Sequence, residues 1–336
     1  MNRNSNIELL RICLMLMIIA GHVMMNHKTS YSLTNSDEII RLLFRSVFCV
    51  AVNSFVIISG YFGIQFKKDR LAHLIIQTFF YSAMFMTLAI ILGWHTINFR
   101  TDMFAFMPIF TKQYWFVTCY VVLYIISPWL NIWVDSLEQS MFRKFLVLGF
   151  LIFFLWPTFS FLINSPRFVE DSGFGIVNFV YLYMLGRYIR LHFLDKHSSI
   201  YYWMGYLLSV MTLFLCQYVL SWVLGFEFTS WTSYNTVLCF TGSVCLFMTF
   251  KNMSFHSSIV NYWAKPCLAV YLIHMAPFIL GKFCMTIGVQ EYHAIYYLLL
   301  IFILPFIIYW GCAIIEILRL KVLGGIENKI VSFLVE

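Results

Sequence analysis

Residues 8–22 read ELLRICLMLMIIAGH, and three of their side chains are of types that do chemistry. Arg11 and His22 are eleven residues apart, which on a helix is three full turns plus about 20°, so both lie on one face. Glu8 lies one turn before Arg11 on the same stripe. At about 1.5 Å of rise per residue, Arg11 and His22 are about 16 Å apart along the axis. One face therefore presents a cation and, farther along, an imidazole, which is the side chain that most often transfers protons near neutral pH.

The same spacing also has a purely structural interpretation. Arg11 would extend to the inner lipid headgroups and pair with Glu8, and His22 would lie at the outer interface. Helix ends tolerate such side chains better than the bilayer centre does. The spacing by itself does not decide between the structural and the catalytic interpretation.

The elements that carry these side chains are predicted to be membrane-spanning helices. With 61% hydrophobic and only 11% charged residues, the chain lacks the charge that a water-facing surface needs. A spanning helix takes about 20 residues, so the apolar runs predict an all-α integral membrane protein, a bundle of about ten helices in one domain over residues 1–336. The predicted spans are 7–25, 41–63, 71–93, 114–134, 143–163, 174–190, 200–223, 233–250, 266–286 and 293–318.

The distribution of lysine and arginine predicts the orientation of these helices. With a cytoplasmic N-terminus, the inner segments hold most of the basic residues: Arg3, Lys67, Lys68, Arg70, Arg143, Lys144, Arg187, Arg190, Lys196, Lys251, Lys265, Arg319, Lys321 and Lys329. The outer loops then hold Lys28, Arg100, Lys112 and Arg167. Both termini are therefore expected in the cytoplasm, and residues 320–336 are expected to form a short amphipathic stretch on the inner surface.

Several other functional classes find no support in the sequence. The net charge of +7 is explained by membrane topology, so we expect no nucleic-acid partner. The nine cysteines lie singly in apolar runs and form no CxxC pair or Cys/His metal spacing. HExxH and GxxxxGK[ST] patterns do not occur, so we expect no metal site and no nucleotide hydrolase.

Four stretches, in order along the chain, together resemble the acyltransferase 3 family of multispanning membrane acyltransferases. The first is the arginine and histidine with ten residues between them on the first helix. The second is SFVIISGYF (54–62), followed at once by FKKDR (66–70). The third is QYWFVTCYVVLYIISPWLN (113–131), and the fourth is YLIH (271–274). The likeness covers nearly the whole chain.

The resemblance implies a reaction and a location. An acyl group, commonly acetyl, would pass from cytoplasmic acyl-CoA to a hydroxyl of a cell-surface or exported polysaccharide or of a lipid-linked sugar. The protein would be a multi-pass O-acetyltransferase of a bacterial cytoplasmic membrane, and polysaccharide-assembly proteins are expected partners. His22 would either accept the proton of the incoming hydroxyl or carry the acyl group itself. Arg11, paired with Glu8, would orient the donor.

The cations of the basic stretch that follows the second helix have two explanations. Lys67, Lys68 and Arg70 would bind the coenzyme A phosphates. Positive-inside topology would place lysine and arginine in the same loop without any ligand.

Further substrate-binding candidates come from the third and fourth stretches and from the second helix. Trp115 and Tyr124 would line the reaction cavity or stack on sugar rings, although Trp115 also fits an interfacial aromatic belt. Tyr271 and His274 would reach the same cavity or bond a neighbouring helix. Arg45, with Arg41 on its face, would bind an anionic acceptor or neutralise loop carboxylates. Many family members have a glutamate where this chain has Tyr120, which is a departure from the pattern.

A function of a different class also accommodates charged residues inside membrane helices. A transporter or flippase would move a lipid-linked sugar or small metabolite without covalent chemistry. That function predicts inverted repeats and Gly/Pro-broken helices at matching positions in two halves, and the sequence shows neither. A non-catalytic membrane sensor with the same fold is a third alternative, favoured if His22 were dispensable.

Overall fold

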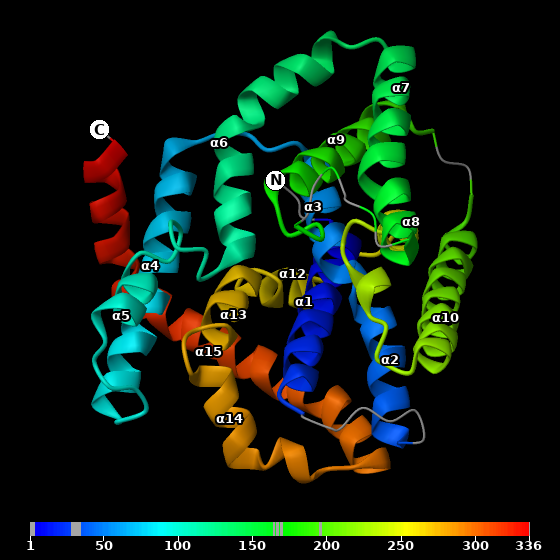
Figure 1. The fold of residues 1–336 in the computed structure, drawn as a ribbon. Coiled ribbons are helices and arrows are strands. Elements are labelled where there is room, and N and C mark those ends of the chain that lie inside the picture. The colour runs from blue at the N-terminus through cyan, green and yellow to red at the C-terminus, as the bar shows by residue number, and fades with distance from the viewer. Residues whose placement is uncertain are drawn as a thin grey trace.

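The computed structural model describes residues 4–27, 35–163, 165, 168, 171–194 and 197–335. These residues form helices and connecting turns (Figure 1). The helices are α1 (Ser5–Met25), α2 (Ser36–Phe48), α3 (Val50–Phe62), α4 (Lys68–Ile91), α5 (Phe99–Phe106), α6 (Trp115–Ser136), α7 (Gln139–Phe150), the π-helical turn η1 (Leu151–Leu155), α8 (Trp156–Ile163), α9 (Ile176–His192), α10 (Ser199–Leu224), the 3₁₀ turn η2 (Ser230–Thr232), α11 (Val237–Lys251), α12 (Ser258–Trp263), α13 (Cys267–His274), α14 (Ile279–Ile287), the 3₁₀ turn η3 (Val289–Glu291) and α15 (Ala294–Val335).

The helical lengths confirm the predicted class of all-α membrane protein. Within the described residues, eight helices are long and apolar enough to cross a bilayer, or nine if α13 and α14 together form one bent span. The predicted span 174–190 corresponds to α9, which has 17 residues. The count of ten therefore stays a prediction. The cytoplasmic placement of both termini also stays a prediction. It depends partly on four basic residues that lie outside the described residues: Arg3, Lys28, Arg167 and Lys196.

The outer helices expose apolar side chains, as a bilayer requires. On α10, Met204, Leu208 and Trp222 are exposed by 62%, 69% and 72%. The opposite face of the same helix is buried and carries Ser209 and Gln217. A helix in water has the reverse arrangement, because burial of apolar surface is what stabilises a soluble fold. The exposed face of α10 therefore faces lipid.

Helix α1 lies in the middle of the bundle and contacts helices from across the chain (Figure 1). It packs against α2 and α3, against α11 to α13, and against α15. In Figure 1, α15 crosses the lower half of the view diagonally, from beside the lower end of α2 to beside α4. The central position of α1 brings its polar face against several helices at once.

Two of the predicted elements differ in the structure. The expected continuous helix 266–286 is broken into α13 and α14, which meet at a bend of 73°. Pro277 lies in this break; it lacks the N–H that a helix would need and disfavours helical backbone in the residue before it. The expected separate amphipathic tail is instead the continuation of α15 to Val335. Arg319 holds this last part of α15 in place through ion pairs to Glu316 and Glu327. Glu327 also bonds His73 on α4.

Candidate functional site

A large cavity of about 1390 Å³ runs along the polar face of α1. Its walls come from α1, from α2 and α3, from the start of α4, from α6, from the segment around η2, and from α13. It receives nine of the site residues expected from the sequence: Glu8, Arg11, His22, Arg45, Lys67, Arg70, Trp115, Tyr124 and Tyr271. Lys68 and His274 are not part of its lining.

At one end of the cavity, α1 contributes a charged pair. Arg11 Nη1 donates to Glu8 Oε2 over 3.3 Å, one turn earlier on the helix. The Arg11 side chain keeps 32% of its surface exposed, whereas that of Glu8 keeps 11%. The Cys267 thiol donates to the backbone carbonyl of Arg11 over 3.6 Å, which ties this part of α1 to α13. The guanidinium is therefore held in place by Glu8 and still faces the cavity.

Farther along α1, His22 contacts a second histidine. Its Nδ1 lies 3.1 Å from Nε2 of His274. The other ring nitrogen of His274, Nδ1, lies 2.6 Å from the backbone carbonyl of Val270. A carbonyl only accepts hydrogen bonds, so His274 Nδ1 carries the proton and, in the neutral ring, His274 Nε2 is an acceptor. His22 Nδ1 then donates to it, which leaves the lone pair of His22 on Nε2.

The break between α13 and α14 places His274 in this position. His274 is the last residue of α13 and is 2% exposed, and the chain turns away immediately after it. A continuous helix through this point would carry on past His22. The ring of Tyr271, one turn earlier on α13, packs edge-on against His274 with centroids 5.9 Å apart. Sequence reasoning offered this contact between helices as one alternative for His274, and the structure identifies the neighbour as His22.

The Arg11 end of the cavity is basic. Lys67 and Arg70 join Arg11 in its lining, so three cations face one carboxylate, Glu8. Lys68 is exposed but lies outside the lining. Tyr124 has a role that the sequence did not indicate: its hydroxyl accepts from the backbone N–H of Lys67 over 3.1 Å and lies 3.2 Å from the Gln65 carbonyl. Its hydroxyl anchors the basic segment, while its ring lines the cavity as expected.

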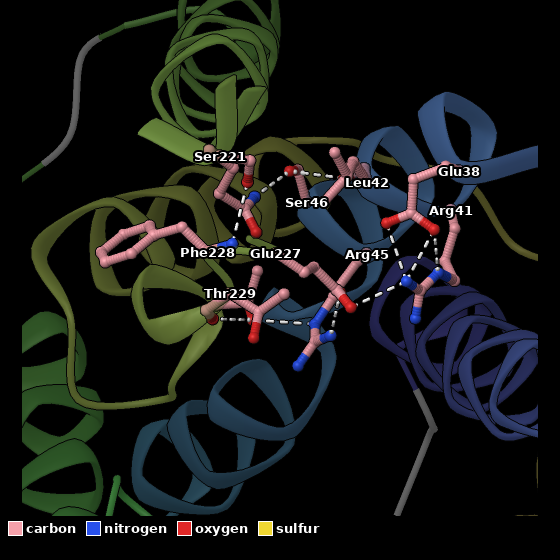
Figure 2. A network of polar contacts seen from close by, with 11 residues as sticks. Glu38, Arg41, Leu42, Arg45, Ser46, Ser221, Glu227, Phe228 and Thr229 are labelled. Carbon is pink, nitrogen blue, oxygen red and sulfur yellow. Dashed lines mark hydrogen bonds and ion pairs between the residues drawn. The ribbon is translucent and has the colours of Figure 1, made fainter. Parts of the chain in front are cut away.

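The opposite end of the cavity is closed by a balanced network of two arginines and two glutamates (Figure 2). Figure 2 shows Glu227 between Arg41 and Arg45, at 2.8 Å and 3.2 Å. Arg41 also bonds Glu38 at 2.7 Å, and Arg45 Nε donates to Thr232 Oγ1 over 3.0 Å. The sequence left two alternatives for these arginines, binding of an anionic acceptor and neutralisation of carboxylates. The contacts in the structure are those of the second alternative.

Aromatic rings line the wall between the two ends. Trp115 packs against Phe174 and Tyr234, with ring centroids 4.6 Å and 5.8 Å away. Tyr120, in the position where a glutamate was expected from the family pattern, also lines the cavity. Phe174 and Tyr234 were missed by sequence reasoning, since each sits in a loop with no recognisable motif around it. The wall offers flat apolar faces of the kind on which sugar rings stack.

These residues form an arrangement capable of acid–base chemistry between two separate binding regions. One region is cationic, the other combines charged hydrogen-bonding groups with aromatic rings, and an imidazole with an available lone pair lies in the same cavity. Comparison with protein families gives one match: the model of the acyltransferase 3 family, described as an acyltransferase domain, matches residues 4–316. The comparisons with curated proteins and with solved structures give no match.

Proposed function

Because the chain belongs to the acyltransferase 3 family, we propose that it is a membrane O-acyltransferase that moves an acetyl group from acetyl-CoA to a sugar hydroxyl. The observation that carries this proposal is the single cavity that joins Arg11, Lys67 and Arg70 at one end to His22 and then to Arg45 at the other. Its volume of about 1390 Å³ exceeds the roughly 300–1,000 Å³ of ordinary small-molecule pockets. It therefore has room for a donor and an acceptor together.

The donor would enter at the Arg11 end. Phosphate groups bind best where cations and backbone N–H groups converge, and Lys67 and Arg70 lie at the first turn of α4. The pantetheine arm would run along the polar face of α1 and bring the thioester to His22. Arg11, fixed by Glu8, would position the arm. We keep Lys68 in the proposal as a peripheral contact only, since it does not line the cavity.

His22 would act as the general base through Nε2. The acceptor hydroxyl gives its proton to Nε2 as its oxygen attacks the thioester carbonyl, and the new ester C–O bond forms. The C–S bond then breaks, and the coenzyme A thiolate takes the proton back from His22. His274, by accepting from His22 Nδ1, would keep the lone pair on Nε2 and stabilise the imidazolium that forms.

The acceptor would occupy the aromatic and charged part of the cavity. A sugar ring would stack on Trp115 or Tyr271, and its hydroxyls would bond Arg45, which forms an ion pair with Glu227. A polysaccharide or a lipid-linked sugar at a bacterial cytoplasmic membrane would meet these requirements. Proteins that assemble and export such glycans would then be partners.

The test is release of coenzyme A from acetyl-CoA by the purified protein in nanodiscs, with and without cell-envelope glycans. Wild type and an exposed-histidine control, His256→Ala, are expected to release coenzyme A when glycan is added, with the acetyl group recovered as an ester. His22→Ala is expected to bind acetyl-CoA and release nothing above the uncatalysed rate. Equal release by His22→Ala and wild type would overturn the catalytic role.

Two further outcomes separate the alternatives. A protein-bound acetyl group that forms without glycan and disappears when glycan is added would show that His22 carries the acyl group covalently. Sugar movement across the nanodisc or vesicle membrane, with no coenzyme A released under any condition, would favour the transporter.

A further inference from the structure

A cluster of two histidines and an aspartate lies outside the cavity, where the ends of three helices meet. His27 follows the end of α1, Asp37 lies in the first turn of α2, and His293 directly precedes α15. One ligand-capable atom from each lies within 4.8 Å of the others. The cluster belongs to neither the donor nor the acceptor region of the cavity, since none of the three residues lines it.

The decisive feature is an unsatisfied nitrogen on His27. This side chain is 3% exposed, and its Nδ1 has no hydrogen-bond partner among the described residues. Its Nε2 lies 2.8 Å from the carbonyl of Tyr292, so Nε2 carries the proton and Nδ1 keeps a lone pair. A buried acceptor without a partner is costly, and native structures rarely leave one.

The other two residues offer the remaining ligands. Asp37 is 1% exposed; its Oδ2 lies 2.6 Å from His293 Nδ1, and its Oδ1 accepts from the backbone N–H of Ala294 over 2.6 Å. This pairing explains Asp37 and His293 as an ion pair and a helix cap. It gives no account of the vacant lone pair of His27.

We propose that His27, Asp37 and His293 form a binding site for a zinc ion. Two imidazoles and one carboxylate are a ligand set that zinc uses in proteins, with a fourth position open to water. The bond from His27 Nε2 to a backbone carbonyl is the kind of outer contact that fixes the tautomer of a metal-binding histidine.

The geometry requires side-chain movements in two directions. In a tetrahedral site with bonds of about 2.0 Å, ligand atoms are about 3.3 Å apart, so His293 Nδ1 and Asp37 Oδ2 would separate by roughly 0.7 Å, and a pair of ligand atoms 4.8 Å apart would close by roughly 1.5 Å. The side chain of His293 is 64% exposed and therefore has space to turn. Its Nδ1 would lose its proton on binding, as metal ligands do.

The site would tie the end of α1 to the starts of α2 and α15. His27 is five residues beyond His22, so the ion would fix the end of the helix that carries the catalytic histidine. No sequence pattern indicates this metal site, because the three residues lie in separate parts of the chain and form no short motif. The expectation of no metal site rested on that missing motif.

The test uses untagged full-length protein in nanodiscs, stripped with a chelator and titrated with Zn²⁺ against a fluorescent competitor. Wild type is expected to bind one equivalent and to show a higher Tm with it. His293→Ala is expected to bind at least about 100-fold more weakly and to show no rise in Tm. The control is His256→Ala. Its neighbour in sequence, Ser257, bonds Ser5 at the other end of α1, about 30 Å along that helix from the end that carries His27.

A second variant and a second metal ion provide further tests of the zinc site. Asp37→Asn, which retains an oxygen for the Ala294 N–H, replaces His293→Ala if that variant does not fold. Co²⁺ added to wild type is expected to give the visible absorption of a tetrahedral site, which needs no variant at all. Binding of Zn²⁺ by wild type no tighter than by His293→Ala or Asp37→Asn, or a Co²⁺ spectrum of a fully hydrated ion, would overturn it.

Discussion

His22 Nδ1 lies 3.1 Å from His274 Nε2, and this contact leaves the lone pair of His22 on Nε2. The Val270 carbonyl fixes the proton on His274 Nδ1, and His274 in turn fixes the proton on His22 Nδ1. Under the proposed function, this arrangement would make His274 a positioning residue. It explains why a buried histidine that does not line the cavity lies beside one that does.

Replacement of His274 is expected to lower kcat while leaving the KM for acetyl-CoA unchanged. In His274→Leu, His22 loses its acceptor and its tautomer is no longer fixed, so kcat should fall about 10–100-fold. His274→Gln supplies an oxygen that can accept from His22 Nδ1 and should recover part of the loss. Steady-state coenzyme A release measures both parameters. Equal kcat values for the Leu and Gln variants would contradict a role through the hydrogen bond.

The basic end of the cavity gives a prediction with its own internal control. Lys67→Ala and Arg70→Ala are each expected to raise the KM for acetyl-CoA about 10–150-fold, because a hydrogen bond to a charged phosphate contributes about 1.5–3 kcal/mol. Lys68→Ala removes an equal charge from the same stretch but outside the lining, and its KM should stay within about twofold. If all three variants changed KM equally, general electrostatic attraction would account for the binding instead.

Sequence reasoning reached the class of fold and one face of the site, for different physical reasons. Composition is enough for an all-α membrane protein, because few charges and long apolar runs admit little else. Helical periodicity is enough to place Glu8, Arg11 and His22 on one face, because 3.6 residues per turn fixes it. Both inferences depend on local properties of the chain.

The contacts between distant segments were beyond that reasoning. His22 and His274 are 252 positions apart, and they meet because α13 ends where it does. Pro277 marked that end in the sequence, but the apolar run continues on both sides of it and suggested one helix. Glu227 likewise lies in a loop 182 positions from Arg45, and no spacing rule connects them. Pro277 is a local cause of the break, whereas the residues that this break and the loops bring together depend on tertiary packing.

Gly60 is predicted to be a packing residue whose replacement destabilises the fold. A Cβ on Gly60 would lie 2.2 Å from the Tyr183 carbonyl oxygen, because α3 and α9 cross with their backbones in contact. Gly60→Ala should therefore cost about 1–3 kcal/mol, as overpacking of a well-packed core does. The control is Gly311→Ala on α15, where a Cβ meets nothing within 4 Å. Because alanine has the higher helix propensity, this substitution should increase stability by as much as about 1 kcal/mol. Thermal unfolding in detergent compares the two, and equal Tm values would refute the close crossing.

The two glutamates of the network in Figure 2 should differ sharply in their contribution to stability. The Glu38 side chain is fully buried, and both of its oxygens accept from Arg41. Glu38→Ala would leave Arg41 with the more exposed Glu227, at 2.8 Å, and breaking a buried pair costs about 3–5 kcal/mol. Glu227 is 24% exposed and its partner Arg45 is 41% exposed, so solvent screening should limit the cost of Glu227→Ala to about 1 kcal/mol or less.

Thermal unfolding of the two single variants measures this difference. The double variant Glu38→Ala/Arg41→Met supplies the control, because removing both members of the buried pair leaves no uncompensated charge and should recover much of the lost stability. No recovery in the double variant would mean that Glu38 acts through packing rather than through its charge. Equal losses of stability for Glu38→Ala and Glu227→Ala would contradict the prediction. They would show that burial of Glu38 does not determine how much its ion pair contributes to stability.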